Sequence, residues 1–236
     1  MLKKHPWFQF LFPLIFILQL CAGWIGSTEL SIFTKPLIVI SLLVMLAVST
    51  RLKGRFHKRI FTALMFALAG DLLLMYAGLD ETYFIWGLAA FLCCHLCYTR
   101  AFYLDFKSAP ELDKKGARIA IACCAVLAIF FYFFLRPHLG IMKLPVMIYI
   151  LVISMMMMMA SFRNQRVNTS SFKLILFGAL FFLLSDGILA YNKFVNPIPY
   201  PGTWIMATYM IAQYLITMGA IERKLLHNIP DPSTNT

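Results

Sequence analysis

Eight apolar stretches separated by short polar connections occupy most of the chain. They lie at about residues 7–25, 33–49, 59–77, 83–104, 118–135, 144–162, 172–191 and 203–221. A helix needs about 20 mostly apolar residues to cross a lipid bilayer, and 61% of the 236 residues are hydrophobic. The connections are too short to hold a water-soluble domain. We therefore predict an all-α, polytopic membrane protein in which residues 1–236 form a single domain of eight transmembrane helices.

The basic residues predict how these helices are oriented. The formal net charge of +11 would suit a nucleic-acid partner, but the lysines and arginines gather between apolar stretches, where the positive-inside rule places them. We therefore expect no nucleic-acid partner. With a cytoplasmic N-terminus, seventeen of the 21 Lys and Arg residues fall on the cytoplasmic side, and the other side carries only Lys35, Arg136, Lys143 and Lys193.

This bias has a consequence for the number of spans. Both the N- and C-termini are then cytoplasmic, which requires an even number of spans and agrees with eight. Short connections and minimal termini are typical of a multi-pass protein of a bacterial cytoplasmic membrane, which is the location that we predict.

Two aspartates lie deep inside apolar stretches. Asp71 follows 63–70, and Asp186 follows 180–185. A carboxylate near the middle of a membrane helix costs roughly 2.5–3.5 kcal/mol on insertion scales, so an intramembrane acid indicates a function and a partner nearby. A structural hydrogen bond between helices is the plainer alternative.

The two aspartates also lie in similar contexts. The segments 71–76 and 186–191 share the pattern Asp-x-(Leu/Ile)-Leu-x-Tyr, and the second and sixth stretches both open with Lys and Pro. An offset of four spans preserves orientation, so the matches suggest a parallel four-helix repeat.

Other polar residues fall at similar depths in the predicted spans. Because lipid cannot satisfy such groups, they turn inward and satisfy one another. We predict one polar pocket, open to the non-cytoplasmic side or sideways to lipid, with Lys35 at its outer lip. The pocket is built from Lys35, Asp71, His95, Tyr98, Ser185, Asp186, Asn192, Tyr209 and Gln213.

This set favours acid–base chemistry. One carboxyl can stay protonated and donate while the other stays ionised. The string Cys93-Cys94-His95-Leu96-Cys97 suggests a metal, but His95 projects away from the face that Cys93 and Cys97 share. We therefore expect neither a metal nor a cofactor. Acidic residues at depth also suit a proton-linked transporter or flippase, which is the alternative function.

The chain resembles the YhhN-type membrane proteins, the family that includes lysoplasmalogenase. The resemblance covers the second to the eighth stretch. It rests on Thr34-Lys35-Pro36-Leu37, Gly70-Asp71, the series Phe84, Gly87, Phe91, His95 and Tyr98, the run Ser185-Asp186 with Ala190, Asn192 and Phe194, and the series Tyr209, Ala212, Gln213 and Ile216.

The resemblance implies eight helices and hydrolysis of the vinyl ether bond of lysoplasmalogens, which yields a fatty aldehyde and glycerophosphocholine or glycerophosphoethanolamine. The substrate and partner would then be a membrane lysophospholipid, with no prediction of oligomeric state. In this hypothesis Asp71, Asp186 and His95 are catalytic. Lys35 meets the phosphate, and the other polar residues, Tyr98, Ser185, Tyr191, Asn192, Tyr209 and Gln213, contact the substrate or orient water.

Overall fold

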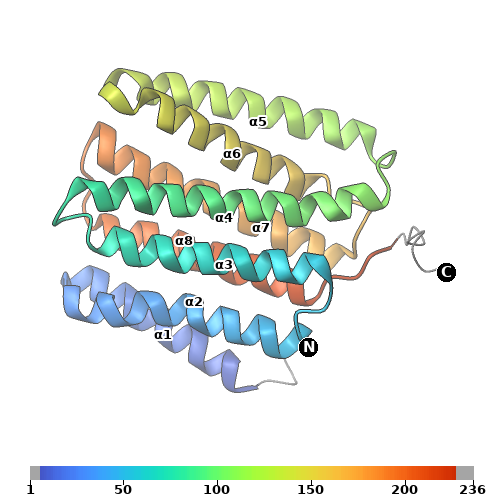
Figure 1. The fold of residues 1–236 in the computed structure, drawn as a ribbon, viewed down its shortest axis with the longest axis horizontal. Helices are drawn as coiled ribbons and strands as arrows, with labels where there is room; N and C mark the ends of the chain where they lie inside the picture. The colour runs from blue at the N-terminus through green and yellow to red at the C-terminus, as the bar shows by residue number, and fades with distance from the viewer. Residues whose placement is uncertain (1–5, 227–236) are drawn as a thin grey trace.

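The computed structural model describes residues 6–226 as a bundle of eight α-helices with roughly aligned axes (Figure 1). Each helix runs from one end of the bundle to the other, so α1 begins and α8 ends at the same end. The chain's own termini lie outside the described residues. The helices are α1 (Pro6–Ile25), α2 (Thr28–Thr50), α3 (Gly54–Met75), α4 (Glu81–Ser108), α5 (Lys114–Leu135), α6 (Lys143–Ser161), α7 (Thr169–Ala190) and α8 (Pro201–Ile221).

Three short helical segments complete the fold. Two 3-10 turns, η2 (Arg136–His138) and η3 (Gly140–Met142), connect α5 to α6, and the π-helical segment η4 (Tyr191–Val195) continues α7. Every predicted apolar stretch is helical, so the all-α fold class is confirmed.

Six helices in the described part of the chain are long and apolar enough to cross a membrane, namely α2 and α4 to α8. In α1 the apolar part is the shorter segment Phe10–Ile25. The α3 helix carries Arg55, Lys58 and Arg59 near its start and Asp71 near its end. The chain is a multi-pass membrane protein, and the crossing of all eight helices stays a prediction.

Polar residues start several helices earlier than the apolar pattern indicates. Ser27 accepts a hydrogen bond from the Leu30 amide, so α2 begins at Thr28 rather than near residue 33. Asp80 caps α4 by accepting from the Thr82 hydroxyl and amide, and these bonds lower the pKa of the Asp80 carboxyl. Helices therefore extend beyond the apolar segments that cross the lipid.

One consequence concerns Lys35. Lys35 does not start a helix, because α2 begins at Thr28 and continues through Pro36 without a break. The neighbouring Thr34 hydroxyl donates to the Leu30 carbonyl over 2.8 Å and also to the Gln19 side chain, which joins α2 to α1. Lys35 consequently lies seven residues into α2 and is half-buried.

The helices form two rows with one helix at the edge. One row holds α1, α8, α7 and α6, and the other holds α2, α3 and α4 (Figure 1). The fifth helix packs chiefly on α6, and Leu135 is its one buried residue. The α5 helix is therefore the outer wall of the bundle.

The interface between α7 and α8 is the most extensive and depends on glycine. A Cβ atom at Gly178 would lie 2.7 Å from Cγ1 of Ile216 and 3.0 Å from the Ala212 carbonyl oxygen. A Cβ atom at Gly219 would lie 2.6 Å from Cγ1 of Ile175. Small residues of this kind let membrane helices approach closely.

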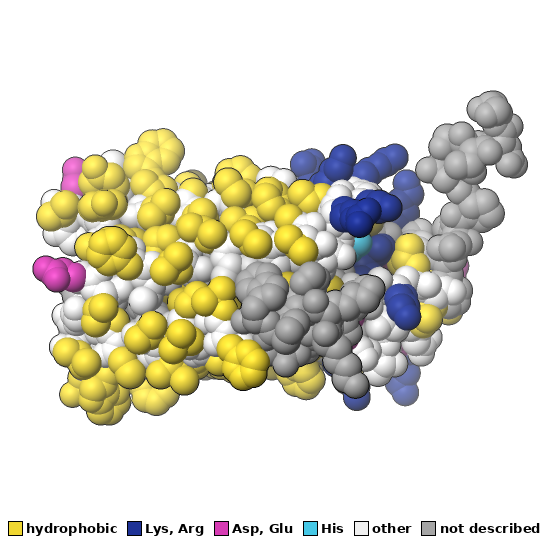
Figure 2. Space-filling view, turned by 90° about the horizontal axis from the view of Figure 1, so that it is seen from below, with side chains coloured by type: hydrophobic (Ala, Val, Ile, Leu, Met, Phe, Trp, Pro, Cys, Tyr) yellow, Lys and Arg dark blue, Asp and Glu magenta, His cyan; other side chains and the backbone are white. Residues whose placement is uncertain are grey.

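The two ends of the bundle differ in charge. Figure 2 shows lysines and arginines at one end, the end at which α8 finishes, and acidic side chains at the other. We call these the basic end and the acidic end. The segregation agrees with the bias predicted from the sequence and places the α2–α3, α4–α5 and α6–α7 connections at the basic end (Figure 1).

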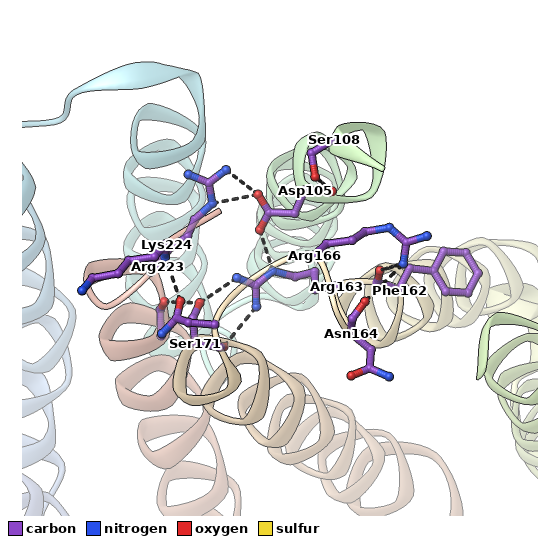
Figure 3. Close-up of polar contacts among 12 residues, drawn as sticks. Asp105, Ser108, Phe162, Arg163, Asn164, Arg166, Ser171, Arg223 and Lys224 are labelled. Atoms are coloured by element: carbon purple, nitrogen blue, oxygen red, sulfur yellow. Dashed lines mark hydrogen bonds and ion pairs between the residues drawn. The ribbon is translucent and has the colours of Figure 1, made fainter. Parts of the chain in front are cut away.

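A buried ion network joins the helices at the basic end (Figure 3). The carboxylate of Asp105 accepts from Nε of Arg163 at 2.8 Å and from Nε of Arg223 at 2.7 Å. Arg163 also donates to the hydroxyl of Ser171 over 2.8 Å. Both Asp105 and Arg163 are completely buried. The network ties α4, the α6–α7 connection, α7 and the segment after α8 together.

A second arginine joins two connections at that end. Arg166 is buried and donates only to backbone carbonyls. Its acceptors are the carbonyl oxygens of Ala109, Pro110, Leu112, Phe162 and Asn164. The α4–α5 connection is thereby held against the α6–α7 connection, which positions the start of α5.

Candidate active site

A cavity of about 1010 Å³ lies between α5 and the rest of the bundle. Its walls come from α4, α5, α6, α7 and η4, and nearly all the lining side chains are apolar. Among the described residues that line it, Asp186 is the one with a charged side chain. A large apolar space with few polar groups suits a long-chain amphiphile.

Asp186 forms a hydrogen-bonded cluster in the cavity wall. Its Oδ2 atom accepts a 2.6 Å hydrogen bond from the hydroxyl of Tyr149 and lies 3.5 Å from Nε2 of His95. The His95 side chain is completely buried, whereas the Asp186 side chain keeps 14% of its surface exposed. We call Asp186, Tyr149 and His95 the Asp186 cluster. It places a proton donor and acceptor at the edge of an apolar cavity.

His95 has spare hydrogen-bonding capacity. Among the described residues, Nε2 finds no partner at conventional distance, although Asp186 is near. A buried polar atom without a partner is costly unless water or a ligand completes it. The ring is held from both sides, with centroids 4.6 Å from Phe182 and 5.4 Å from Tyr149. The geometry suits a water molecule or substrate oxygen beside the imidazole.

Asp71 lies in a different environment. Its Oδ2 atom accepts a 2.7 Å hydrogen bond from the hydroxyl of Tyr209, and both residues are buried. The Lys35 ammonium is near enough to interact electrostatically with this carboxyl. Neither Asp71 nor Tyr209 lines the cavity. The Asp71–Tyr209 pair is therefore internal.

Phe182 packs between the two carboxyl sites. Its ring contacts both the His95 ring, at 4.6 Å, and the Tyr209 ring, at 5.6 Å, and it is fully buried. The two aspartates accept from tyrosines of different helices, α6 for Asp186 and α8 for Asp71. The sites are neighbours across one phenylalanine, but their surroundings are not equivalent.

The other predicted residues divide between cavity and interior. Tyr191 lines the cavity and stacks on Phe134 at a centroid distance of 6.2 Å. The Tyr98 hydroxyl donates to Oε1 of Gln213 at 2.5 Å, away from the cavity lining. Asp186 and Tyr191 therefore line the cavity, whereas Asp71, Tyr98, Tyr209 and Gln213 do not. The single pocket predicted from the sequence is divided between the cavity and the interior.

Two further predicted residues bond to the backbone. The Ser185 hydroxyl donates to the Ile205 carbonyl, which joins α7 to α8. The Asn192 side chain accepts from the Ile198 amide and holds the connection after η4.

Sequence reasoning missed Tyr149. It lies in an otherwise apolar stretch of α6, where a tyrosine is easily taken for core. The available signal is chemical, because a tyrosine hydroxyl inside a membrane needs a partner and Asp186 was already known to need one. As for metals, the described residues contain no group of three His, Cys, Asp or Glu side chains that could hold an ion.

Comparison with known proteins identifies the family. Residues 30–220 match the model of the YhhN family, which is most of the chain. The chain belongs to the YhhN family. No solved structure matches it.

Several curated relatives of this YhhN protein carry the name lysoplasmalogenase. It is 34% identical to human "Lysoplasmalogenase TMEM86A" over 170 residues, which cover 70% of this chain and 66% of that protein. It is 32% identical to human "Lysoplasmalogenase TMEM86B" over 213 residues, or 88% of this chain and 85% of that protein.

A bacterial relative is named in the same way. The chain is 30% identical to "Lysoplasmalogenase" of Mycobacterium tuberculosis over 172 residues, which cover 70% of this chain and 61% of that protein. The region of the YhhN match contains both aspartates, their tyrosines and the whole cavity wall. The candidate site thus lies within the part of the chain that defines the family.

Proposed function

We propose that this YhhN protein hydrolyses the vinyl ether bond of lysoplasmalogens. The observation that carries the proposal is the Asp186 cluster, in which an acid and a tyrosine line an apolar cavity and a buried histidine lies 3.5 Å behind the acid. Relatives named lysoplasmalogenase support the substrate class. The alkenyl chain lies along the apolar lining, and the vinyl ether lies beside Asp186.

The reaction needs an acid and a water molecule. The protonated carboxyl of Asp186 donates its proton to the vinyl carbon that is not bonded to oxygen, which turns the adjacent carbon and the ether oxygen into an oxocarbenium ion. Water adds to that carbon and loses a proton to the Asp186 carboxylate. The resulting hemiacetal breaks its bond to the glycerol oxygen, which takes up the hydroxyl proton, and releases a fatty aldehyde.

The remaining cluster residues support these steps. His95 orients the water through Nε2, and Tyr149 holds the Asp186 carboxyl in position. Asp71 completes the pair of carboxyls from behind Phe182, where its negative charge favours the cationic intermediate. Tyr209 holds the Asp71 carboxyl through its hydrogen bond, and the Tyr98–Gln213 pair supports the interior around it.

The substrate-binding roles extend to the remaining predicted residues. Tyr191 contributes to the cavity wall, while Ser185 and Asn192 hold the helix end that carries it. Lys35, which the sequence suggests for the phosphate, interacts electrostatically with Asp71 and lies on α2, which contributes no residue to the cavity lining.

The proposal includes the position in the membrane. All eight helices cross the bilayer, and the basic end faces the cytoplasm. The location is a bacterial cytoplasmic membrane. Because Asp186 lies four residues from the end of α7 at the acidic end, the vinyl ether is near the non-cytoplasmic interface.

Purified protein in detergent tests the activity. We expect it to release aldehyde from a lysoplasmalogen without any ion gradient and in the presence of a chelator, and to leave the saturated alkyl ether analogue intact. Asp186→Asn and Asp71→Asn should each abolish aldehyde release while the protein still elutes as a folded species. Full turnover in both variants would rule out the carboxyl pair, and transport in vesicles without hydrolysis would favour the transporter.

A further inference from the structure

The cavity reaches the acidic end beside one ion pair. Phe84 of α4 and Phe194 of η4 both line the cavity and pack edge to face at 6.2 Å. The Lys193 ammonium lies 4.8 Å from the centre of the Phe84 ring and 3.5 Å from Oε1 of Glu81. The pair therefore sits directly over a wall of the cavity.

Lysines and arginines are scarce at this end, so each one needs a reason. Among residues 6–226, four lie there: Lys35, Arg136, Lys143 and Lys193. Lys35 is on α2, which contributes nothing to the cavity lining, and Arg136 contacts Phe133, which is not a lining residue. Lys193 is the one of the four with a cation–π contact to a cavity-lining ring in the described structure.

The Lys193–Glu81 pair is easily exchanged for a ligand. The Lys193 side chain is 38% exposed and that of Glu81 is 88% exposed. Ion pairs between exposed side chains contribute little stability, because water screens both charges. A ligand that brings its own opposite charges can therefore replace the contact at small cost.

We propose that Lys193 and Glu81 bind the zwitterionic headgroup of the lysolipid, with Lys193 at the phosphate and Glu81 at the amine-bearing end. This inference rests on the proposed vinyl ether hydrolysis. The order of charges matches, since a phosphocholine or phosphoethanolamine group presents a negative and a positive charge side by side. Lysine binds phosphate as a point charge, and the Phe84 ring can also face a quaternary ammonium.

The distances along the chain fit this arrangement. Lys193 follows Asp186 by seven residues, which corresponds to about 10 Å along a helix. Five bonds separate the ether oxygen from phosphorus, which is a reach of roughly 6 Å when the chain is extended, because an extended chain advances about 1.2 Å per bond. The flexible lysine side chain spans the remainder. A substrate whose vinyl ether lies at Asp186 thus presents its phosphate within reach of Lys193.

Three substrates with the same alkenyl chain test the assignment: alkenyl glycerophosphocholine, alkenyl glycerophosphate and alkenyl glycerol. We expect Lys193→Gln to raise KM for the two phosphate-bearing substrates by about fivefold to tenfold. Lys193→Gln should leave kcat unchanged for the two phosphate-bearing substrates. For alkenyl glycerol it should leave both kcat and KM unchanged. Glu81→Gln should raise KM for the phosphocholine substrate alone. Lys143→Gln, which removes an exposed charge at the same end, serves as the control.

Several outcomes would overturn the assignment. An equal rise in KM for alkenyl glycerol in Lys193→Gln would mean a loss of general packing. An equal effect of Lys143→Gln would mean a general effect of charge. A phosphate-selective loss in Lys35→Gln with none in Lys193→Gln would place the phosphate at α2.

A binding measurement separates this inference from the proposed reaction. The saturated alkyl glycerophosphocholine has the headgroup but no vinyl ether, so it should stabilise the protein against heat without being hydrolysed. If no vinyl ether is cleaved, the proposed function fails. Stabilisation that is lost in Lys193→Gln would still support the headgroup site, and stabilisation that is equal in both proteins would contradict it.

Discussion

At the residue scale, the two buried aspartates differ in what surrounds them. Asp186 and Tyr149 line the cavity, with the buried His95 behind them, whereas Asp71 is enclosed with Tyr209 behind the Phe182 ring. A matched sequence context therefore leads to one carboxyl that lines the cavity and one that is enclosed in the interior. Position in the bundle, more than the local motif, decides which carboxyl a ligand in the cavity can reach.

Removing the Tyr149 hydroxyl tests the Asp186 cluster. Tyr149→Phe deletes the 2.6 Å hydrogen bond to Oδ2 of Asp186 and leaves the ring in place. In the proposed reaction Asp186 becomes a carboxylate as it gives up its proton, so this bond strengthens in the transition state. A hydrogen bond to a charged group contributes about 1.5–3 kcal/mol, so we expect kcat to fall roughly tenfold to a hundredfold. The rate of aldehyde release measures this.

Tyr132→Phe is the matched control for that experiment. Tyr132 is partly buried on α5 and does not line the cavity. Its substitution should leave kcat within twofold or so of the unaltered protein. If the two substitutions had equal effects, Tyr149 would have no particular part in the reaction.

The sequence predicts the acids more readily than their partners. Asp71, Asp186 and His95 stand out because charged or ionisable groups inside apolar stretches are expensive. Tyr149 does not stand out, since tyrosine is common in apolar helices. Asp105, Arg163 and Arg223 resemble ordinary loop charges in sequence, and only the folded chain brings them into one buried network.

At the element scale, the number and order of helices follow from hydropathy, but their ends do not. The apolar pattern places the fourth span at 83–104, whereas α4 runs from Glu81 to Ser108 because capping and backbone bonding continue into the interface. The π-helical turn of η4 carries no clear sequence signal, and it follows directly on the helix that holds Asp186.

Close packing of α7 on α8 gives a stability prediction. Gly178→Ala places a Cβ atom 2.7 Å from Cγ1 of Ile216 and 3.0 Å from two backbone atoms. Because backbone atoms cannot move aside without disturbing the helix, we expect the free energy of unfolding to fall by about 1–3 kcal/mol. Thermal unfolding in detergent would report a lower midpoint. Gly202→Ala is the control, because nothing lies within 4 Å of its Cβ position, and an equal loss there would contradict the packing explanation.

The hydrogen bonds by which Arg166 joins the α4–α5 and α6–α7 connections give a second prediction at this scale. Arg166→Lys keeps the positive charge but replaces a planar fork that serves five carbonyl oxygens with an ammonium that has three donors. Buried carbonyl oxygens that lose their donor should lower the free energy of unfolding by about 2–4 kcal/mol. The exposed Arg55→Lys should change the unfolding midpoint little. An unchanged unfolding midpoint in Arg166→Lys would show that the Arg166 hydrogen bonds add no stability.

At the scale of the whole molecule, charge and helix direction agree. Consecutive helices alternate in direction, and the connections at the basic end are those that carry most of the lysines and arginines (Figures 1 and 2). Simple counting of charges in the sequence predicts this arrangement. Which helices meet is not predictable in the same way, because apolar faces of similar composition do not specify a partner.

Chemical labelling of single cysteines tests the orientation. In a background without the native cysteines, we expect Ser27→Cys, Leu79→Cys and Gly140→Cys to react with an impermeant maleimide added outside intact cells. Leu52→Cys, Ala109→Cys and Gln165→Cys should react only after the cells are opened. Labelling of both groups from the same side would exclude the arrangement of eight spans.

Completion of the network around Asp105 depends on the order in which the chain is synthesised. Its members Asp105, Arg163 and Ser171 emerge from the ribosome well before Arg223, which lies in the last described segment. Until that residue is made, the carboxylate lacks one of its two guanidinium partners. The polar interior at the basic end can thus close only after α8 has been inserted and the segment that follows it has been made.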